Sequence, residues 1–140
     1  MSDPAYAIQV ALVGRLVALA TEAGPRVYDD VPSEEQRTSD TGEAWPYISL
    51  GNGQMVPVDE ECFDRSSTYI DVNVWSRDIG FPQVKRIAGA IRAALHEKEL
   101  AIAGHVLDRM RVETISYSRD PDGVTRRARI ELLVETQPAI

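Results

Sequence analysis

The chain has 140 residues, 44% hydrophobic and 26% charged, a size and composition typical of one soluble globular domain over residues 1–140. Its 15 basic and 22 acidic residues leave a net charge of -7, which argues against sequence-specific DNA binding because that needs clustered cations. The single cysteine excludes an internal disulfide framework. Asp3, Gln9 and Arg15 interrupt the first apolar segment, and no window approaches the ~20 apolar residues of a membrane span. We therefore expect an intracellular protein with no signal peptide and no membrane partner.

The first predicted element is a helix that begins near Asp3 and Pro4. Aspartate accepts free backbone N–H groups at a helix start, and proline at the first position loses no hydrogen bond. Gly24 permits a left-handed stop, and Pro25 cannot continue the helix. The apolar residues that should face the core recur at helical spacing: Ile8, Leu12, Leu16 and Leu19.

A polar stretch separates two short predicted strands, over residues 26–31 and 47–51. Residues 32–45 have almost nothing to bury, so we expect a long polar loop that cannot offset its ordering entropy alone. Structureless connections longer than ~12 residues are usually functional or disordered. The pattern over residues 55–61 is too mixed to predict an element. The loop residues that we expect to make contacts are Glu34, Glu35, Asp40 and Glu43.

The second half of the chain predicts a strand, a helix and a hairpin. Residues 68–75 alternate between apolar side chains on one face and Tyr69 and Trp75 on the other. A helix should run from Pro82 to about His96, and the turn at 120–123 should join two strands into a hairpin. We predict an α+β domain with a largely antiparallel, mixed sheet, two helices packed on one face and a C-terminal β-hairpin.

No cluster of residues predicts catalysis, a metal site or a cofactor. Cys62 as a nucleophile needs a positioned histidine, but acidic neighbours should raise its pKa, and His96 and His105 lie on other elements. A small hydrolase that uses Cys62 or His105 is the enzymatic alternative. The acids near Cys62 lack the ligand spacing of a calcium loop and favour a solvated rim: Asp59, Glu60, Glu61 and Asp64.

Charge and exposed aromatic residues favour a protein–protein interface. Arginines on the hairpin and acids in the first half give opposite patches, which suit head-to-tail contact between copies. Alternatively, these arginines pair with acids across the hairpin on a solvated face. Exposed aromatic residues are enriched at interfaces. The predicted contact residues are Tyr69, Trp75, Arg77, Arg126, Arg127 and Arg129.

Six short segments resemble, in order and spacing, the tail-completion or tail-terminator proteins of long-tailed phages and of phage-like gene-transfer particles. They are Arg26-Val27-Tyr28 with Val31-Pro32, Pro46-Tyr47-Ile48-Ser49-Leu50-Gly51, Val72-Asn73-Val74-Trp75-Ser76, Ile91-Arg92-Ala93-Ala94-Leu95-His96, Ala103-Gly104-His105 and Asp120-Pro121-Asp122-Gly123. The resemblance covers about residues 5–135. It departs from the family at residues 33–44, which are longer and more acidic than the family's connection.

The resemblance implies a structural subunit, without catalytic residues, that forms a ring, commonly a hexamer. Such a ring ends tail-tube growth at the head-proximal end and docks the tail to the filled head. The implied partners are copies of the chain itself, the tail-tube protein, the head-completion or connector protein, and DNA that passes the lumen without specific binding. Assembly would be cytoplasmic, before incorporation into the particle. A head-completion or connector subunit, or a small monomeric binding module, are the alternatives.

Overall fold

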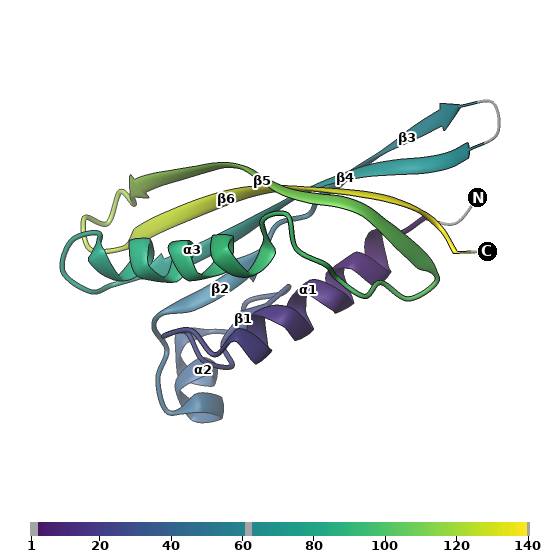
Figure 1. Cartoon of the computed structure of the whole chain (residues 1–140). Helices are drawn as coiled ribbons and strands as arrows, with labels where there is room; N and C mark the ends of the chain where they lie inside the picture. Colours follow the sequence, from purple (N-terminus) through teal and green to yellow (C-terminus); the bar gives the residue numbers. More distant parts are fainter. Residues whose placement is uncertain (1–2, 61–62, 140) are drawn as a thin grey trace.

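Among the residues that the computed structural model describes, 3–60 and 63–139, six strands form one sheet (Figure 1). The strand order is β1-β2-β4-β6-β5. Strand β3 pairs with residues 63–69 of β4, whereas β2 pairs with residues 72–75 of the same strand. The pairing of β1 with β2 is parallel and every other pairing is antiparallel, which confirms the predicted mixed sheet. The bounds are β1 Val27–Tyr28, β2 Tyr47–Leu50, β3 Gln54–Glu60, β4 Phe63–Ser76, β5 His105–Arg119 and β6 Arg126–Pro138.

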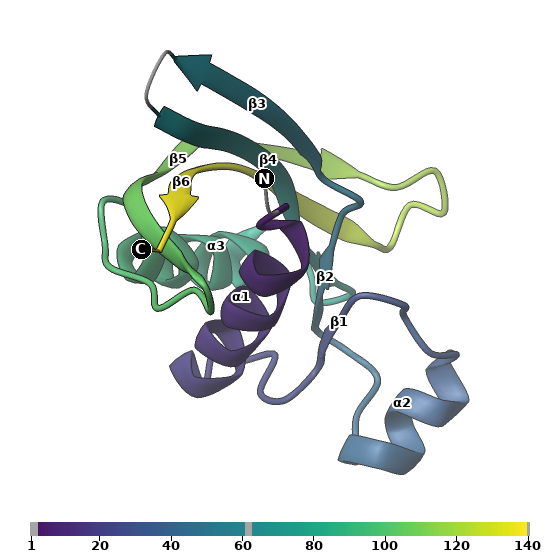
Figure 2. The same ribbon diagram turned by 90° about the vertical axis from the view of Figure 1, so that its right-hand side faces the viewer.

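Helices α1 (Ala5–Leu19) and α3 (Pro82–Leu95) cover one face of the sheet, as predicted (Figures 1 and 2). The carboxylate of Asp3 accepts the N–H of Ala5 at 2.8 Å, so this aspartate caps the helix start. Helix α1 ends with Ala20 in the left-handed conformation, four residues before the predicted stop at Gly24. Helix α3 has the predicted start at Pro82 and ends at Leu95, and His96, the predicted end, is its C-cap.

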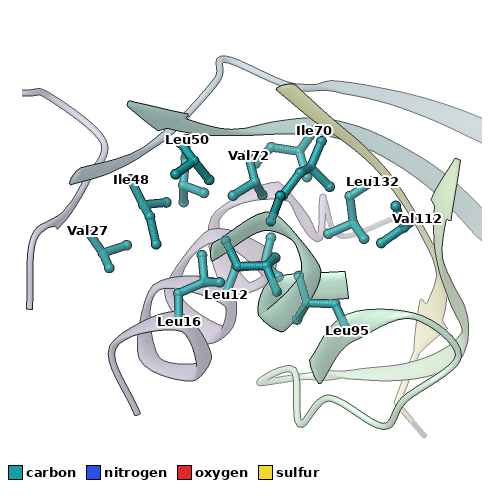
Figure 3. Packing of buried hydrophobic residues seen from close by; sticks show 14 of the residues in the cluster. Leu12, Leu16, Val27, Ile48, Leu50, Ile70, Val72, Leu95, Val112 and Leu132 are labelled. Atoms are coloured by element: carbon teal, nitrogen blue, oxygen red, sulfur yellow. The ribbon is translucent and has the colours of Figure 1, made fainter. Parts of the chain in front are cut away.

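The hydrophobic core lies between these two helices and the sheet (Figure 3). Ile8, Leu12 and Leu16 of α1 are fully buried, in line with their predicted spacing, and Leu19 is partly buried. From α3, the buried residues are Val84, Ile87, Ala88, Ile91 and Leu95. The sheet contributes alternate residues of its strands, including Val72 and Val74 of β4 and Ile130 and Leu132 of β6. The opposite face of the sheet has no helix packed across it in the described chain, and we call it the open face.

The prediction of a loop over residues 32–45 is wrong in its middle, where helix α2 (Glu34–Thr41) lies at the periphery of the molecule (Figure 2). The Ser33 hydroxyl caps this helix by accepting the N–H of Gln36 at 3.2 Å. Gly42 ends it at a φ of 85°, a left-handed conformation that glycine adopts without a steric cost. Only one residue of α2 is buried, so no apolar periodicity marks the helix in the sequence.

Strand β4 is longer than predicted and pairs with β3, a strand that the sequence pattern did not reveal. The two form a hairpin that projects past both sheet-covering helices (Figure 1), and we call residues 54–60 and 63–69 the arm. Pro57 lies within β3, where its missing N–H is tolerated because β3 is an edge strand. Strand β1 is shorter than the predicted 26–31, whereas β5 and β6 form the predicted C-terminal hairpin.

Candidate interaction surfaces

Of the predicted contact residues on β4 and β6, four lie on the open face, whereas Arg126 lies opposite the buried Ser76 on the other side: Tyr69, Trp75, Arg127 and Arg129. The antiparallel register sets Trp75 opposite Arg127 and Asn73 opposite Arg129, and directly opposed residues point to the same side of a sheet. Tyr69 lies on this face at the base of the arm and is 46% exposed. The alternation over residues 68–75 therefore placed the core side and the open side of β4 correctly.

Four aromatic rings form a continuous cluster at the β2 end of the open face, and we call it the aromatic cluster: Tyr28, Trp45, Tyr47 and Trp75. Tyr47 stacks on Trp75 with ring centroids 6.2 Å apart, and Trp45 lies 5.0 Å from Tyr47. The indole N–H of Trp75 donates to the Ser49 hydroxyl at 2.9 Å. Burial raises the pKa of the Tyr47 phenol, and the positive charges of two nearby arginines partly oppose that change.

Arg37 joins helix α2 to the aromatic cluster, although the sequence pattern gave no reason to select it. Its guanidinium carbon lies 4.3 Å from the ring centroid of Tyr47 and 5.1 Å from that of Trp45. The same group donates to the carbonyl oxygens of Ala44 at 3.0 Å and Pro32 at 2.7 Å. Arg37 is only 5% exposed, so one arginine holds the helix on the sheet.

Arg26 is a second buried arginine that the sequence did not single out. It donates to the carbonyl oxygens of Pro46 at 2.7 Å and Glu22 at 3.2 Å, and its guanidinium lies 3.5 Å from the Glu43 carboxylate. Glu43, a predicted contact residue, therefore has a partner within the chain. Together the two buried arginines fix residues 32–46 to the body of the domain.

Arg77 connects α2, the end of β4 and the β5–β6 turn. Its guanidinium lies 4.5 Å from the Trp45 ring centroid and within 3.7 Å of the carboxylates of Glu34 and Asp122. Asp122 also accepts hydrogen bonds from the hydroxyl and N–H of Thr125 and from the N–H of Val124. These hydrogen bonds, with Arg77, lower the Asp122 pKa to about 2.

The three predicted hairpin arginines also have partners within the chain. Arg127 lies over the Trp75 ring at 5.0 Å and donates two hydrogen bonds to the Asn73 side chain. Arg129 pairs with Asp71 of β4 at 3.0 Å and with Glu131 of its own strand at 3.3 Å, so neither pair spans the hairpin as the alternative expected. Arg126 donates to the carbonyl oxygens of Gly123 and Val124 in the turn. Local pairing thus neutralises part of the charge that we assigned to an intermolecular patch.

The remaining acids predicted for contacts lie on exposed α2. Asp40 accepts a hydrogen bond from the Gln36 side chain at 2.8 Å, and Glu35 is exposed in the first turn. Glu34, besides its pair with Arg77, accepts the indole N–H of Trp45 at 3.3 Å. Of the four predicted acids, Glu35 and Asp40 are therefore exposed on α2. Glu34 and Glu43 instead pair with arginines of the same chain.

A trough of about 550 Å³ crosses the open face beside the aromatic cluster. It runs from the β2–β3 turn at Asn52 and Gly53 to the side chains of β4, β5 and β6. Its charged lining consists of Arg129 and three acids, and the full polar and aromatic lining is Asn52, Gln54, Tyr69, Asp71, Glu113, Arg129 and Glu131.

The histidines considered for catalysis have structural contacts. His96 Nδ1 accepts the backbone N–H of Val112 at 3.0 Å, a bond that ties the end of α3 to β5. His105 Nδ1 lies 3.0 Å from the Ala103 carbonyl oxygen. Cys62 and Glu61 fall outside the described residues, and the side chains of Asp59 and Glu60 are not described. Within the described ranges, no group of His, Cys, Asp and Glu side chains is arranged to hold a metal ion.

Solved structures share this fold over nearly the whole chain. A chain of the virion of a native gene transfer agent particle superposes with a TM-score of 0.81 at 22% identity, covering 98% of this chain and 99% of that one. Another solved chain matches with a TM-score of 0.57 at 18% identity over 100% and 98% of the two chains. No curated protein sequence matches the chain.

The family described as Tail completion protein gp17 matches residues 7–136, and the chain belongs to this family. The predicted resemblance is confirmed, and the chain has a structural role in a phage tail or phage-like particle. The family is one of structural phage tail proteins. Within the described ranges, no helix has the length and apolar character needed to cross a bilayer.

Proposed function

We propose that the protein is a tail terminator that closes into a ring, with six copies expected, at the head-proximal end of the tail tube. Membership of the tail-completion family over residues 7–136 carries this proposal. A domain of this size has a radius of gyration of roughly 14 Å, so a passage for DNA must lie between subunits rather than through one. Such a ring stops tube growth and offers its other side to the head-completion or connector protein.

The open face is the proposed surface for contacts with the tube or with other copies. Two features support this role: the aromatic cluster forms a rigid, partly exposed apolar platform, and the adjacent trough is concave. Exposed α2 provides an acidic rim next to both. The residues we propose for contacts are Tyr69, Trp75, Arg77, Arg127 and Arg129 on the face, Arg126 at the β5–β6 turn, and Glu34, Glu35, Asp40 and Glu43 on and beside α2.

The net charge of -7 per subunit supports a lumen that repels phosphate and lets DNA slide without binding. Assembly then begins in the cytoplasm, and the finished ring stays in the particle. A structure of the ring whose channel lining is mainly basic would contradict this part of the proposal.

Deletion of the gene followed by electron microscopy of the particles tests the function. We expect tails of uncontrolled length or tails detached from filled heads, and complementation by the wild-type gene should restore normal particles. Complementation by Cys62→Ser or His105→Gln should also succeed, because neither residue has a catalytic role in the proposal. Normal, infectious or transducing particles from the deletion strain would refute it, and heads that leak DNA beside tails of normal length would favour a connector subunit.

A further inference from the structure

Helix α1 exposes an apolar stripe that its own chain leaves uncovered. Tyr6 is 79% exposed, Val10 54% and Val17 41%, and their spacing puts them on the side opposite the buried Ile8, Leu12 and Leu16. Arg15 is the only charged residue of α1, and it donates to the carbonyl oxygens of Ala94 and Glu99. A helix that is apolar on all sides is normally buried on all sides. The stripe therefore requires a covering partner.

Gly14 provides a second, independent sign of a close contact. It lies within the exposed stripe, and a Cβ added there would meet no other part of the described chain within 4 Å. Glycine in a helix interior is less stable than alanine, so its presence there usually reflects a close contact. No contact within the described chain explains Gly14, whereas the close approach of another backbone would explain it. Beside the stripe, a groove of about 250 Å³ is lined by Tyr6, Ala7, Val10, Ala11, Ala101 and Ala103.

The helix layer, formed by α1 and α3, has a net charge opposite in sign to that of the rest of the chain. Helices α1 and α3 contain no Asp or Glu and four cations, Arg15, Lys85, Arg86 and Arg92. Arg86 pairs with Glu22 at 2.7 Å, so the two helices with this partner carry +3, and with a total of -7 the rest of the chain carries -10. An acidic segment from another copy therefore meets attraction at the helix layer and like-charge repulsion over most other surfaces.

The arm has the complementary composition. Val56 and Val58 of β3 are 38% and 37% exposed on one side of the arm, which projects past the helices (Figure 1). Residues 66–69 of the arm also pair with β6, so within the described chain only its outer part, residues 58–60 and 63–65, is two-stranded. A two-stranded hairpin alone is marginally stable in water, so a partner surface would stabilise it. Residues 54–68 contain four acids and one arginine, which leaves a charge of -3. One side of the arm therefore presents two valines, opposite Ser67 and Arg65 of the paired strand, and the segment as a whole is acidic in sequence.

We infer that the arm of one subunit packs on the α1 stripe of the next, with Val56 and Val58 against Tyr6, Val10 and Gly14. This contact rests on the proposed ring and names its subunit interface. Because the two surfaces differ, the contact is heterologous, and repeated contacts of this kind close into a ring. The net negative charge of the arm segment then complements the positive charge of the two helices.

Disulfide cross-linking in assembled particles tests the contact. The protein carries Cys62→Ser together with Val10→Cys and Val58→Cys, and purified particles are oxidised mildly and run on a non-reducing gel. We expect a ladder of multimers larger than dimers. The matched control pairs Val10→Cys with Val124→Cys, an equally exposed valine in the β5–β6 turn, and should stay monomeric.

The outcomes separate the two proposals. Particles that contain the double variant but yield no ladder overturn the arm contact and leave the ring intact. A cross-linked band containing a different protein also overturns it, because α1 then contacts the tube or connector. Particles that lack the protein altogether refute the proposed function itself.

A second variant tests the role of Gly14. Gly14→Gln should melt at or above the wild-type temperature, because the site is open within the chain, yet its incorporation into particles should fall at least tenfold. Gly89→Gln on α3, whose site is equally open, should melt similarly and be incorporated normally. Normal incorporation of Gly14→Gln would overturn the inference.

Discussion

Replacing Arg37 by alanine should detach helix α2 from the domain without unfolding the core. The change removes two hydrogen bonds to backbone carbonyls and the contacts with two aromatic rings. Charged hydrogen bonds contribute about 1.5–3 kcal/mol each and cation–π contacts about 0.5–2 kcal/mol, and these terms are not additive. We take about 3 kcal/mol as the loss of local stability. Arg37 is the only buried residue of α2, and eight residues are too few for a stable isolated helix.

Hydrogen exchange of the α2 amides measures this effect. A loss of about 3 kcal/mol corresponds to exchange at least 100-fold faster in residues 34–41, because each 1.4 kcal/mol is a factor of ten. Amides of β4 and β6 should change far less. Arg37→Lys should give an intermediate result, since lysine keeps the charge but not the planar fork. Glu35→Gln on the exposed side of α2 is the matched control. Unchanged exchange in Arg37→Ala would refute the view that this arginine holds the helix.

Three further outcomes follow from the fold. Leu12→Ala should destabilise the protein by about 3–5 kcal/mol in urea unfolding because Leu12 is fully buried, whereas Val10→Ala should cost far less. The pKa of Asp122 is lowered to about 2 in the folded protein, so the ionised carboxylate stabilises the fold at pH values above the ordinary aspartate pKa. This stabilisation is lost as the pH falls through about 2. The difference in melting temperature between wild type and Asp122→Asn should therefore shrink between pH 5 and pH 2. A constant difference would contradict this assignment. His96→Ala should increase amide exchange at Val112 several-fold, because it removes the acceptor of that N–H.

Periodic apolar patterns explain which parts of the fold were predictable. The spacing of Ile8, Leu12 and Leu16 identified α1 and its buried side, and the alternation around Val72 identified β4 and its two faces. These patterns depend on local geometry, because every 3.6 or every second residue returns to the same side. The turn at residues 120–123 was predictable for the same reason, since proline and glycine restrict the backbone locally.

Helix α2 and strand β3 were missed because contacts with neighbouring segments, rather than an apolar period of their own, stabilise them. Arg37 is polar, and only the rings of Trp45 and Tyr47 and two backbone carbonyls make its burial favourable. Strand β3 contains Pro57 and becomes a strand by pairing with β4. The candidate surfaces were partly predictable: Tyr69 and Trp75 face outward as expected, but the internal partners of Arg127 and Arg129 depend on strand register.

The amino-acid sequence by itself determined the fold class, the two helices that cover the sheet and the family, because these follow from apolar periodicity and short segments in order. Tertiary structure alone decided which charges are neutralised and which apolar surfaces stay open. The arginines of the hairpin find acids and rings on neighbouring strands, while the outward side of α1 finds nothing in the described chain. The physical reason is that burial and pairing depend on distances between elements, which a linear pattern does not contain.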